Sequence, residues 1–177
     1  MGVSSCQKDE NATTVHAKAQ LQTDSVKKLN SVSAAGNYLA SKGTLKIKVQ
    51  DSTYTFDASQ DSVAFINETI NGKQYFGVTA INKAHTVSFG ISSSAPIADM
   101  YGTVAWAQFL MHVAGKANIE YTLTHNAPPR DYGSIKIEKY KRDTILAIGT
   151  FHTYLAKDSK PSSPFFIADG SFDLEGK

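Results

Sequence analysis

Gly133-Ser134-Ile135-Lys136-Ile137-Glu138 opens the stretch that decides the fold, and this stretch ends at Leu174. Its isoleucines alternate with Lys and Glu, the period of two that is typical of a strand with one face in water. A second run, from Thr144 to Leu155, is apolar on both faces at first and less regular after Gly149, which predicts a strand with a bulge. The third run carries its apolar side chains at Phe165, Ile167, Phe172 and Leu174. Together the runs predict one continuous antiparallel unit that closes the domain.

Alternating runs also precede this unit. Two of them lie within 44–58, on either side of Asp51-Ser52, and others begin at His85 and at Ile119. The runs 62–70 and 74–81 are separated by Asn71-Gly72, a dipeptide that accepts the positive φ angles of a type I′ hairpin turn. This spacing predicts an all-β fold, an antiparallel sandwich or barrel of about eight to ten strands.

The stretch 103–114 has two interpretations. Its large apolar residues recur at helical spacing, and its Ala, Gln, Leu and Met residues favour a helix. We therefore expect one short helix near 103–114, with Thr103 at its start and Gly115 at its end. The alternative is a buried strand, because the run is short and apolar enough for one.

Composition bounds the class of protein. A chain of 177 residues with 41% hydrophobic content can bury a single core. The 18 basic and 16 acidic side chains are interspersed and leave a net charge of +2, without the basic block that a phosphate backbone requires. Nucleic acid is therefore not an expected partner. No apolar run approaches the roughly 20 residues of a membrane-spanning helix.

The N-terminal residues predict a lipid anchor. Val3-Ser4-Ser5-Cys6 resembles the lipobox at which bacterial lipoprotein signal peptides are cleaved, and Lys8-Asp9-Glu10 resembles the export signal of surface lipoproteins in the Bacteroidota. The alternative is a free thiol in a frayed end. Acylation of Cys6 implies attachment to the outer membrane and exposure at the cell surface. Polar, weakly hydrophobic sequence then predicts a flexible tether, which gives a lipoprotein N-terminus and tether at 1–42 and one β-rich domain at 43–177.

Several short motifs are similar to a β-rich domain family of unknown function found in Bacteroidota surface lipoproteins. They are Phe56-Asp57-Ala58, the Asn71-Gly72 hairpin, Tyr101-Gly102, Gly133-Ser134-Ile135-Lys136-Ile137, Gly149-Thr150-Phe151 and Asp169-Gly170-Ser171-Phe172. The resemblance covers roughly Leu45 to the C-terminus. It implies an all-β extracytoplasmic domain, and it implies no reaction.

No catalytic or metal-binding motif accompanies this pattern. The five histidines never pair at close metal-ligand spacing, and the chain has neither a nucleophile elbow nor a phosphate-binding glycine loop. Carboxylates on different strands can still meet across a cleft, which sequence does not exclude. We predict no catalytic activity, no metal and no cofactor.

Recognition through aromatic side chains is the leading functional hypothesis. Tyr101, Trp106 and Tyr132 lie beside loops, and loops held by a rigid scaffold carry many binding residues. The alternative is that Trp106 belongs to the core and the tyrosines cover the ends of the fold. We predict a surface lipoprotein domain that acts as a binding or accessory module for a glycan or a protein. A structural envelope component without a small ligand, and a lipocalin-like carrier of an apolar molecule, are the alternatives.

Four positions resemble the O-glycosylation acceptors of the Bacteroidota. Each is a Ser or Thr preceded by Asp and followed by Val, Thr or Ile, and the four are Ser25, Ser52, Ser62 and Thr144. The pattern predicts that some of them carry glycans in the native host.

Overall fold

The computed structural model describes residues 37–124, 132–142, 144, 146–158, 160 and 163–176. Cys6 and Ser25 lie outside these described residues, and so do the predicted anchor and most of the predicted tether. Asn37–Leu39 form a strand and Ala40 is buried, so strand structure begins ahead of Gly43, the expected start of the domain. In the described part of the chain, no helix has the length and apolar character needed to cross a membrane.

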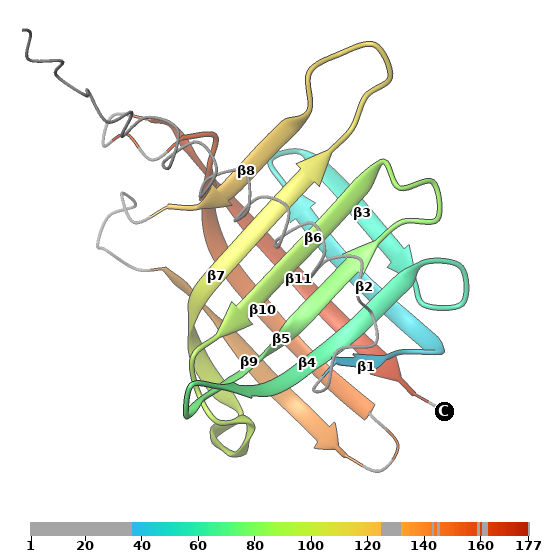
Figure 1. Ribbon diagram of the computed structural model, residues 1–177, viewed down its shortest axis with the longest axis vertical. Coiled ribbons are helices and arrows are strands. Elements are labelled where there is room, and N and C mark those ends of the chain that lie inside the picture. The colour runs from blue at the N-terminus through green and yellow to red at the C-terminus, as the bar shows by residue number, and fades with distance from the viewer. Residues whose placement is uncertain are drawn as a thin grey trace, which may run out of the picture. The chain divides into compact units, whose positions relative to one another are not determined.

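Eleven strands form a single antiparallel sheet in the described residues (Figure 1). They are β1 (Asn37–Leu39), β2 (Lys42–Val49), β3 (Ser52–Asp57), β4 (Ser62–Ile70), β5 (Lys73–Ile81), β6 (Val87–Ser93), β7 (Tyr101–Met111), β8 (Ile119–Leu123), β9 (Gly133–Lys141), β10 (Leu146–Ala156) and β11 (Phe165–Glu175), with a single 3-10 turn, η1 (Ile97–Asp99). The order across the sheet is β1-β4-β5-β6-β7-β8-β10-β11-β2-β3, and β9 pairs with both β7 and β10. The predicted all-β antiparallel class is confirmed.

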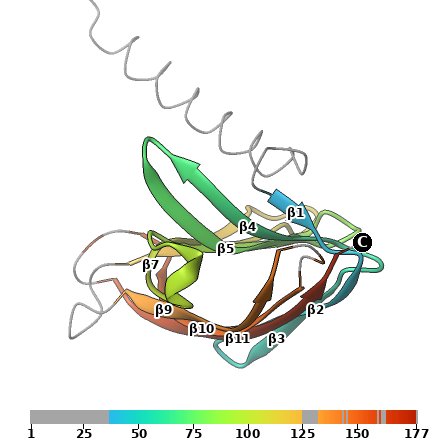
Figure 2. The same cartoon turned by 90° about the horizontal axis from the view of Figure 1, so that it is seen from below.

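The sheet turns back on itself so that two layers face each other (Figure 2). One layer contains β1, β4, β5, β6 and β7, and the other contains β9, β10, β11, β2 and β3. The layers are joined along one side, where β7 pairs with β8 and β9 and both of these pair with β10. Each layer therefore buries one face against the other, which is the packing of a sandwich.

Aromatic rings join the two layers across the core. Phe89 of β6 stacks on Phe151 of β10, with ring centroids 5.2 Å apart and planes 20° apart. Phe65 of β4 approaches Phe172 of β11 at 6.3 Å. All four side chains are at most 4% exposed, so these contacts belong to one packed interior.

The closing unit forms as predicted, with β9 paired to β10 and β10 paired to β11. In this unit Gly149 lies opposite Phe172, and Gly170 lies opposite Phe151. A Cβ on Gly149 would lie 2.6 Å from Cζ of Phe172, and a Cβ on Gly170 would come closer still to Cζ of Phe151. Each ring therefore covers a glycine of the neighbouring strand, an arrangement that stabilises glycine-containing sheets. The motifs Gly149-Thr150-Phe151 and Gly170-Ser171-Phe172 are the two halves of this arrangement.

The predicted bulge lies beside Gly149, but on the other strand. The register shifts between Ile148, which faces Lys139, and Gly149, which faces Ile137, so the extra residue is Glu138 of β9. Gly149 itself stays paired with Phe172. The glycine interrupts the apolar alternation because a ring occupies the space above it, and the expectation of a bulge in β10 is wrong for that reason.

Two turns show where local sequence signals succeed and fail. Asn71 and Gly72 have φ angles of 51° and 78°, and they join β4 to β5 as the predicted two-residue hairpin. His85 was expected to begin a strand, but it has a φ of 54° and lies in a turn. The Asn82 side chain holds this turn, because its Oδ1 accepts hydrogen bonds from the backbone N–H groups of Thr86 and Val87 at 2.8 and 3.0 Å. The strand begins only at Val87.

The helix expected near 103–114 is wrong, because this stretch is the strand β7. Val104, Ala107 and Phe109 point into the core, and each is only 1% exposed. The spacing of three between Val104 and Ala107 marks a bulge rather than a helical turn. Trp106 and Leu110 lie on the opposite face, so the apparent helical period combines residues from both faces of one strand.

Replacing Gly170 with alanine should destabilise the domain, because the new Cβ would overlap the Phe151 ring, which is itself stacked on Phe89. We expect a loss of roughly 1–3 kcal/mol in the free energy of unfolding, measured by urea denaturation. The control is Ser171→Ala, at an exposed neighbouring position, for which a change within roughly 0.5 kcal/mol is expected. Equal stability of the two variants would contradict the role assigned to this glycine.

Candidate functional site

A β-bulge places Trp106 on the outer surface. In the β6–β7 ladder Ser92 pairs with Trp106 and Ser93 pairs with Val104, so Ala105 is the extra residue. Ala105 and Trp106 consequently both face outward, whereas strict alternation from Val104 would direct Trp106 into the core. The Trp106 side chain is 41% exposed.

The Trp106 indole lies over Gly90 of β6. A Cβ built on Gly90 would be 2.6 Å from Cζ3 and 2.8 Å from Cη2 of the ring, so only glycine leaves room for the indole here. One face of the ring is therefore covered by the strand. Since the side chain remains 41% exposed, the rest of the ring is accessible. Contact with the strand on one side restricts the orientations of the ring, and such restriction lowers the entropy that a ligand must remove on binding.

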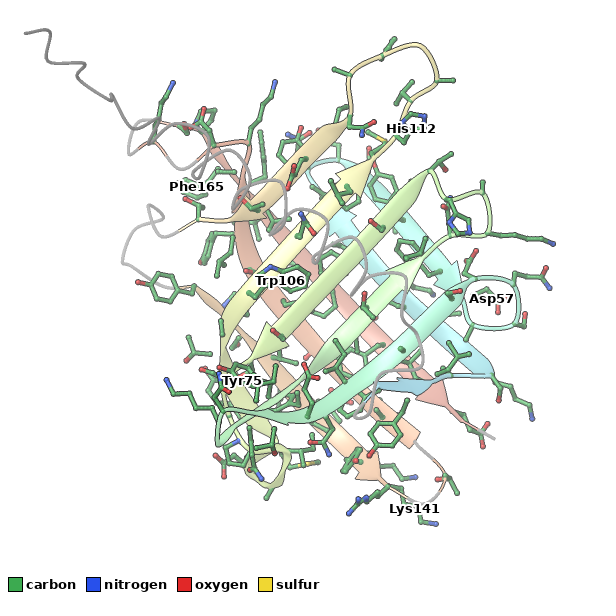
Figure 3. The ribbon with its side chains drawn as sticks, viewed as in Figure 1. Asp57, Tyr75, Trp106, His112, Lys141 and Phe165 are labelled. Carbon is green, nitrogen blue, oxygen red and sulfur yellow. The ribbon has the colours of Figure 1, made fainter. Side chains whose placement is uncertain are left out.

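An open groove of about 790 Å³ begins at this ring. Its described lining comes from three places: the tip of the β4–β5 hairpin, β6 with the loop that follows it, and the bulge of β7. The residues are Thr69, Gly72, Lys73, Gln74, Tyr75, Ser92, Ser94, Pro96, Ala105 and Trp106. Figure 3 shows Tyr75 and Trp106 on the layer that contains β5, β6 and β7. The volume is within the range of small-molecule sites.

The groove combines two aromatic side chains with hydroxyl and amide groups. Tyr75 faces outward because its neighbour Phe76 is fully buried in the core. Lys73 is the one charged side chain among the described lining residues. Such a surface can stack on a flat or ring-shaped ligand and donate or accept hydrogen bonds beside it.

The three aromatic residues predicted from the sequence do not form one site. Trp106 lines the groove, but neither Tyr101 nor Tyr132 is among its described lining residues. Tyr101 is 55% exposed at the start of β7, opposite Lys136 of β9. Tyr132 is half-buried against the core, and its backbone carbonyl accepts a 2.9 Å hydrogen bond from the Thr153 hydroxyl. The packing expected as the alternative therefore applies to Tyr132 and not to Trp106.

Sequence reasoning missed Tyr75, Ser92 and Ser94. A signal for Tyr75 was present, because the Asn71-Gly72 turn sets the register of β5 and with it the face on which each of its residues lies. Their proximity to Trp106 depends on the order of β5, β6 and β7 in the sheet, which no local pattern specifies.

The described O-glycosylation candidates are accessible. Ser52, Ser62 and Thr144 are each exposed and lie in or beside turns. Before Ser62, the Asp61 carboxylate accepts backbone hydrogen bonds from Asp57 at 2.9 Å and from Lys83 at 2.8 Å. This aspartate thus has a structural role in its turn, whether or not Ser62 carries a glycan.

The perturbed carboxylates lie in turns outside the groove lining. The hydroxyl and the backbone N–H of Ser59 both donate to Asp57 and lower the pKa of its carboxyl group. The Ser163 hydroxyl and the Lys160 N–H lower the pKa of Asp158 in the same way. These shifts reflect turn formation, because the hydrogen bonds come from residues close in sequence.

One hydroxyl–imidazole pair occurs on the other layer. Ser134 Oγ lies 3.3 Å from His152 Nδ1, and Asp169 is the cross-strand neighbour of His152. Nucleophilic catalysis needs such a pair together with a substrate pocket and oxyanion donors. The described groove is lined by the opposite layer, so the two features do not form one site.

Among the described residues, no three His, Cys, Asp or Glu side chains are grouped to hold a metal ion.

Comparison with known proteins identifies no relative of this chain. No protein-family model, no curated protein and no solved structure matches it.

Replacing Gly90 with alanine should displace the indole, because the added Cβ cannot coexist with Cζ3 and Cη2 in their present positions. Trp106 is the only tryptophan in the chain, so fluorescence reports on this one ring. We expect a red-shifted emission and stronger quenching by acrylamide, with the circular dichroism of the folded sheet retained. Ser88→Ala, two residues earlier on β6, is the control and should leave both signals unchanged. An unaltered Trp106 spectrum in Gly90→Ala would contradict the contact.

Proposed function

We propose that the strand domain is a non-catalytic binding module that recognises a glycan or a protein through the Trp106 groove. The observation that carries the proposal is the exposed tryptophan, which a bulge directs outward and a glycine holds in place. Tryptophan and tyrosine side chains are enriched at binding interfaces and carry much of the binding energy there. A groove beside such a residue favours recognition over a purely structural role.

We further propose that the module belongs to a lipoprotein of the outer membrane, exposed at the cell surface. The lipobox-like Val3-Ser4-Ser5-Cys6 supports this part of the proposal. A lipid on Cys6 followed by a polar segment would hold the groove away from the membrane surface.

Transport of an apolar molecule inside the sheet is less well supported. Tyr54 of β3 lies against Phe109 of β7 at 4.9 Å, as Phe89 lies against Phe151 at 5.2 Å. Side chains from opposite walls thus occupy the interior where a carrier would need space for its ligand. The groove that Trp106 lines lies on the outside of the layer in the described residues.

Binding can be tested with the emission of Trp106. The wild-type domain, titrated with a panel of oligosaccharides and peptides, should show a saturable shift or quenching with at least one member. Trp106→Ala should weaken that interaction by about tenfold or more, measured by calorimetry, because an aromatic anchor is removed. Lys46→Ala, on the exposed face of the other layer, is the control and should bind normally. No interaction with any member would favour the structural envelope component, and turnover of a member would refute the non-catalytic assignment.

The anchor can be tested by expressing the chain behind a complete lipoprotein signal peptide in a bacterial host. Cys6 should carry fatty acids, detected by mass spectrometry of the N-terminal peptide, and the protein should fractionate with the outer membrane. Cys6→Ala should release it, since no apolar run replaces the lipid. Unchanged fractionation of Cys6→Ala would refute the localisation.

A further inference from the structure

We infer that the ligand of the Trp106 groove is a neutral oligosaccharide, an inference that rests on the binding function proposed above. A pyranose ring has an apolar face of C–H groups and a rim of hydroxyl groups. The groove offers the complement of both, an accessible indole face and a set of short polar side chains beside it. Sites of this kind bind by apolar contact and are made specific by a few well-placed polar groups.

The charges of the groove favour an uncharged ligand. Recognition of a phosphate or a carboxylate relies on Arg or on several cationic donors, and recognition of a cation relies on carboxylates. Among the described lining residues, Lys73 is the one charged side chain, and it is exposed in the first position after the hairpin turn. Ionic attraction across open solvent from such a position is weak.

The pairing of the strands decides where an extended peptide could add to the sheet. A peptide that adds to a sheet needs a free strand edge. β5 is paired with β4 and β6, β6 with β5 and β7, and β7 with β6, β8 and β9. β6, which carries Ser92, is paired along both sides, whereas among the described residues 67–70 of β4, 73–75 of β5 and 104–107 of β7 each have one side without a strand partner. Binding of the unrelated peptide in the titration below therefore tests strand addition directly.

The polar side chains favour a sugar over a proline-rich peptide, a class of ligand that also docks on aromatic grooves. A proline-rich ligand presents mostly ring carbons and backbone carbonyls, whereas each sugar unit presents several hydroxyl groups. Ser92 and Ser94 among the lining residues carry hydroxyl groups, and Ser92 pairs with Trp106 and so lies on the same face as the indole. These side chains can both donate and accept, which matches hydroxyl groups that also do both.

The test is a titration of the wild-type protein with neutral oligosaccharides of cellulose, xylan, mannan, starch and chitin, beside a proline-rich peptide and an unrelated peptide. We expect saturable binding of at least one oligosaccharide, followed by Trp106 emission and by calorimetry. Trp106→Ala should weaken it by about tenfold or more, and Ser92→Ala by about threefold to tenfold. Lys73→Gln should change affinity by less than about threefold, and affinity should be the same in low and high sodium chloride.

The outcomes distinguish this inference from the proposed function. Binding of either peptide at Trp106 without any oligosaccharide would overturn the sugar assignment and leave the binding function standing. Binding that disappears in high salt or in Lys73→Gln would overturn the neutral class. Oligosaccharide binding that Trp106→Ala leaves unchanged would overturn the site. Failure of every probe to bind the wild-type protein would overturn both the sugar assignment and the proposed binding function. Trp106→Phe keeps an aromatic ring and should retain part of the affinity. It therefore controls for the case in which Trp106→Ala loses binding because it misfolds.

Discussion

The contact of a phenylalanine ring with a glycine on one side and a second ring on the other sets the spacing of this sandwich. Phe151 is held between Gly170 of its own layer and Phe89 of the opposite layer. Phe172 has the same relation to Gly149 and Phe65. A side chain larger than hydrogen at either glycine would push its ring toward the other layer. Protein interiors are packed too densely to absorb such a displacement, so the two layers depend on these glycines.

The same contact explains why the interior tolerates so few irregularities. Rings that must lie over particular glycines fix the register of β10 against β11, because a slip of one residue would turn both rings out of the core. The bulges in the described ladders lie on other strands, at Glu138 of β9 and at Ala105 of β7. Each shifts the alternation of its strand by one residue. The second of them also directs Trp106 outward.

The sequence was sufficient for the fold wherever the signal is local. Alternation identified most strands, and Asn71-Gly72 identified a hairpin whose two φ angles are both positive. Prediction failed at β7 because a bulge shifts the alternation by one residue, and its position depends on the pairing of Ser92 and Ser93 with another strand. For the same reason, only part of the candidate site could be predicted from the sequence. Trp106 could be selected by its residue type, but Tyr75 reaches the groove through the order of the strands, and Tyr132 packs against the core.

Trp106, Phe151 and Phe172 take part in the same kind of ring–glycine contact, but their surroundings differ. All three rings lie over a glycine of a neighbouring strand, at Gly90, Gly170 and Gly149. In the core the second face of each ring is covered by a ring of the opposite layer. The Trp106 ring lies on an outer face and keeps 41% of its side chain exposed in the described structure. A flat apolar group placed against its exposed part would make a ring contact of the kind that Phe89 makes with Phe151. The glycine–ring contact that stabilises the interior of this fold thus also positions Trp106 on its surface, where we propose that a ring-shaped ligand binds.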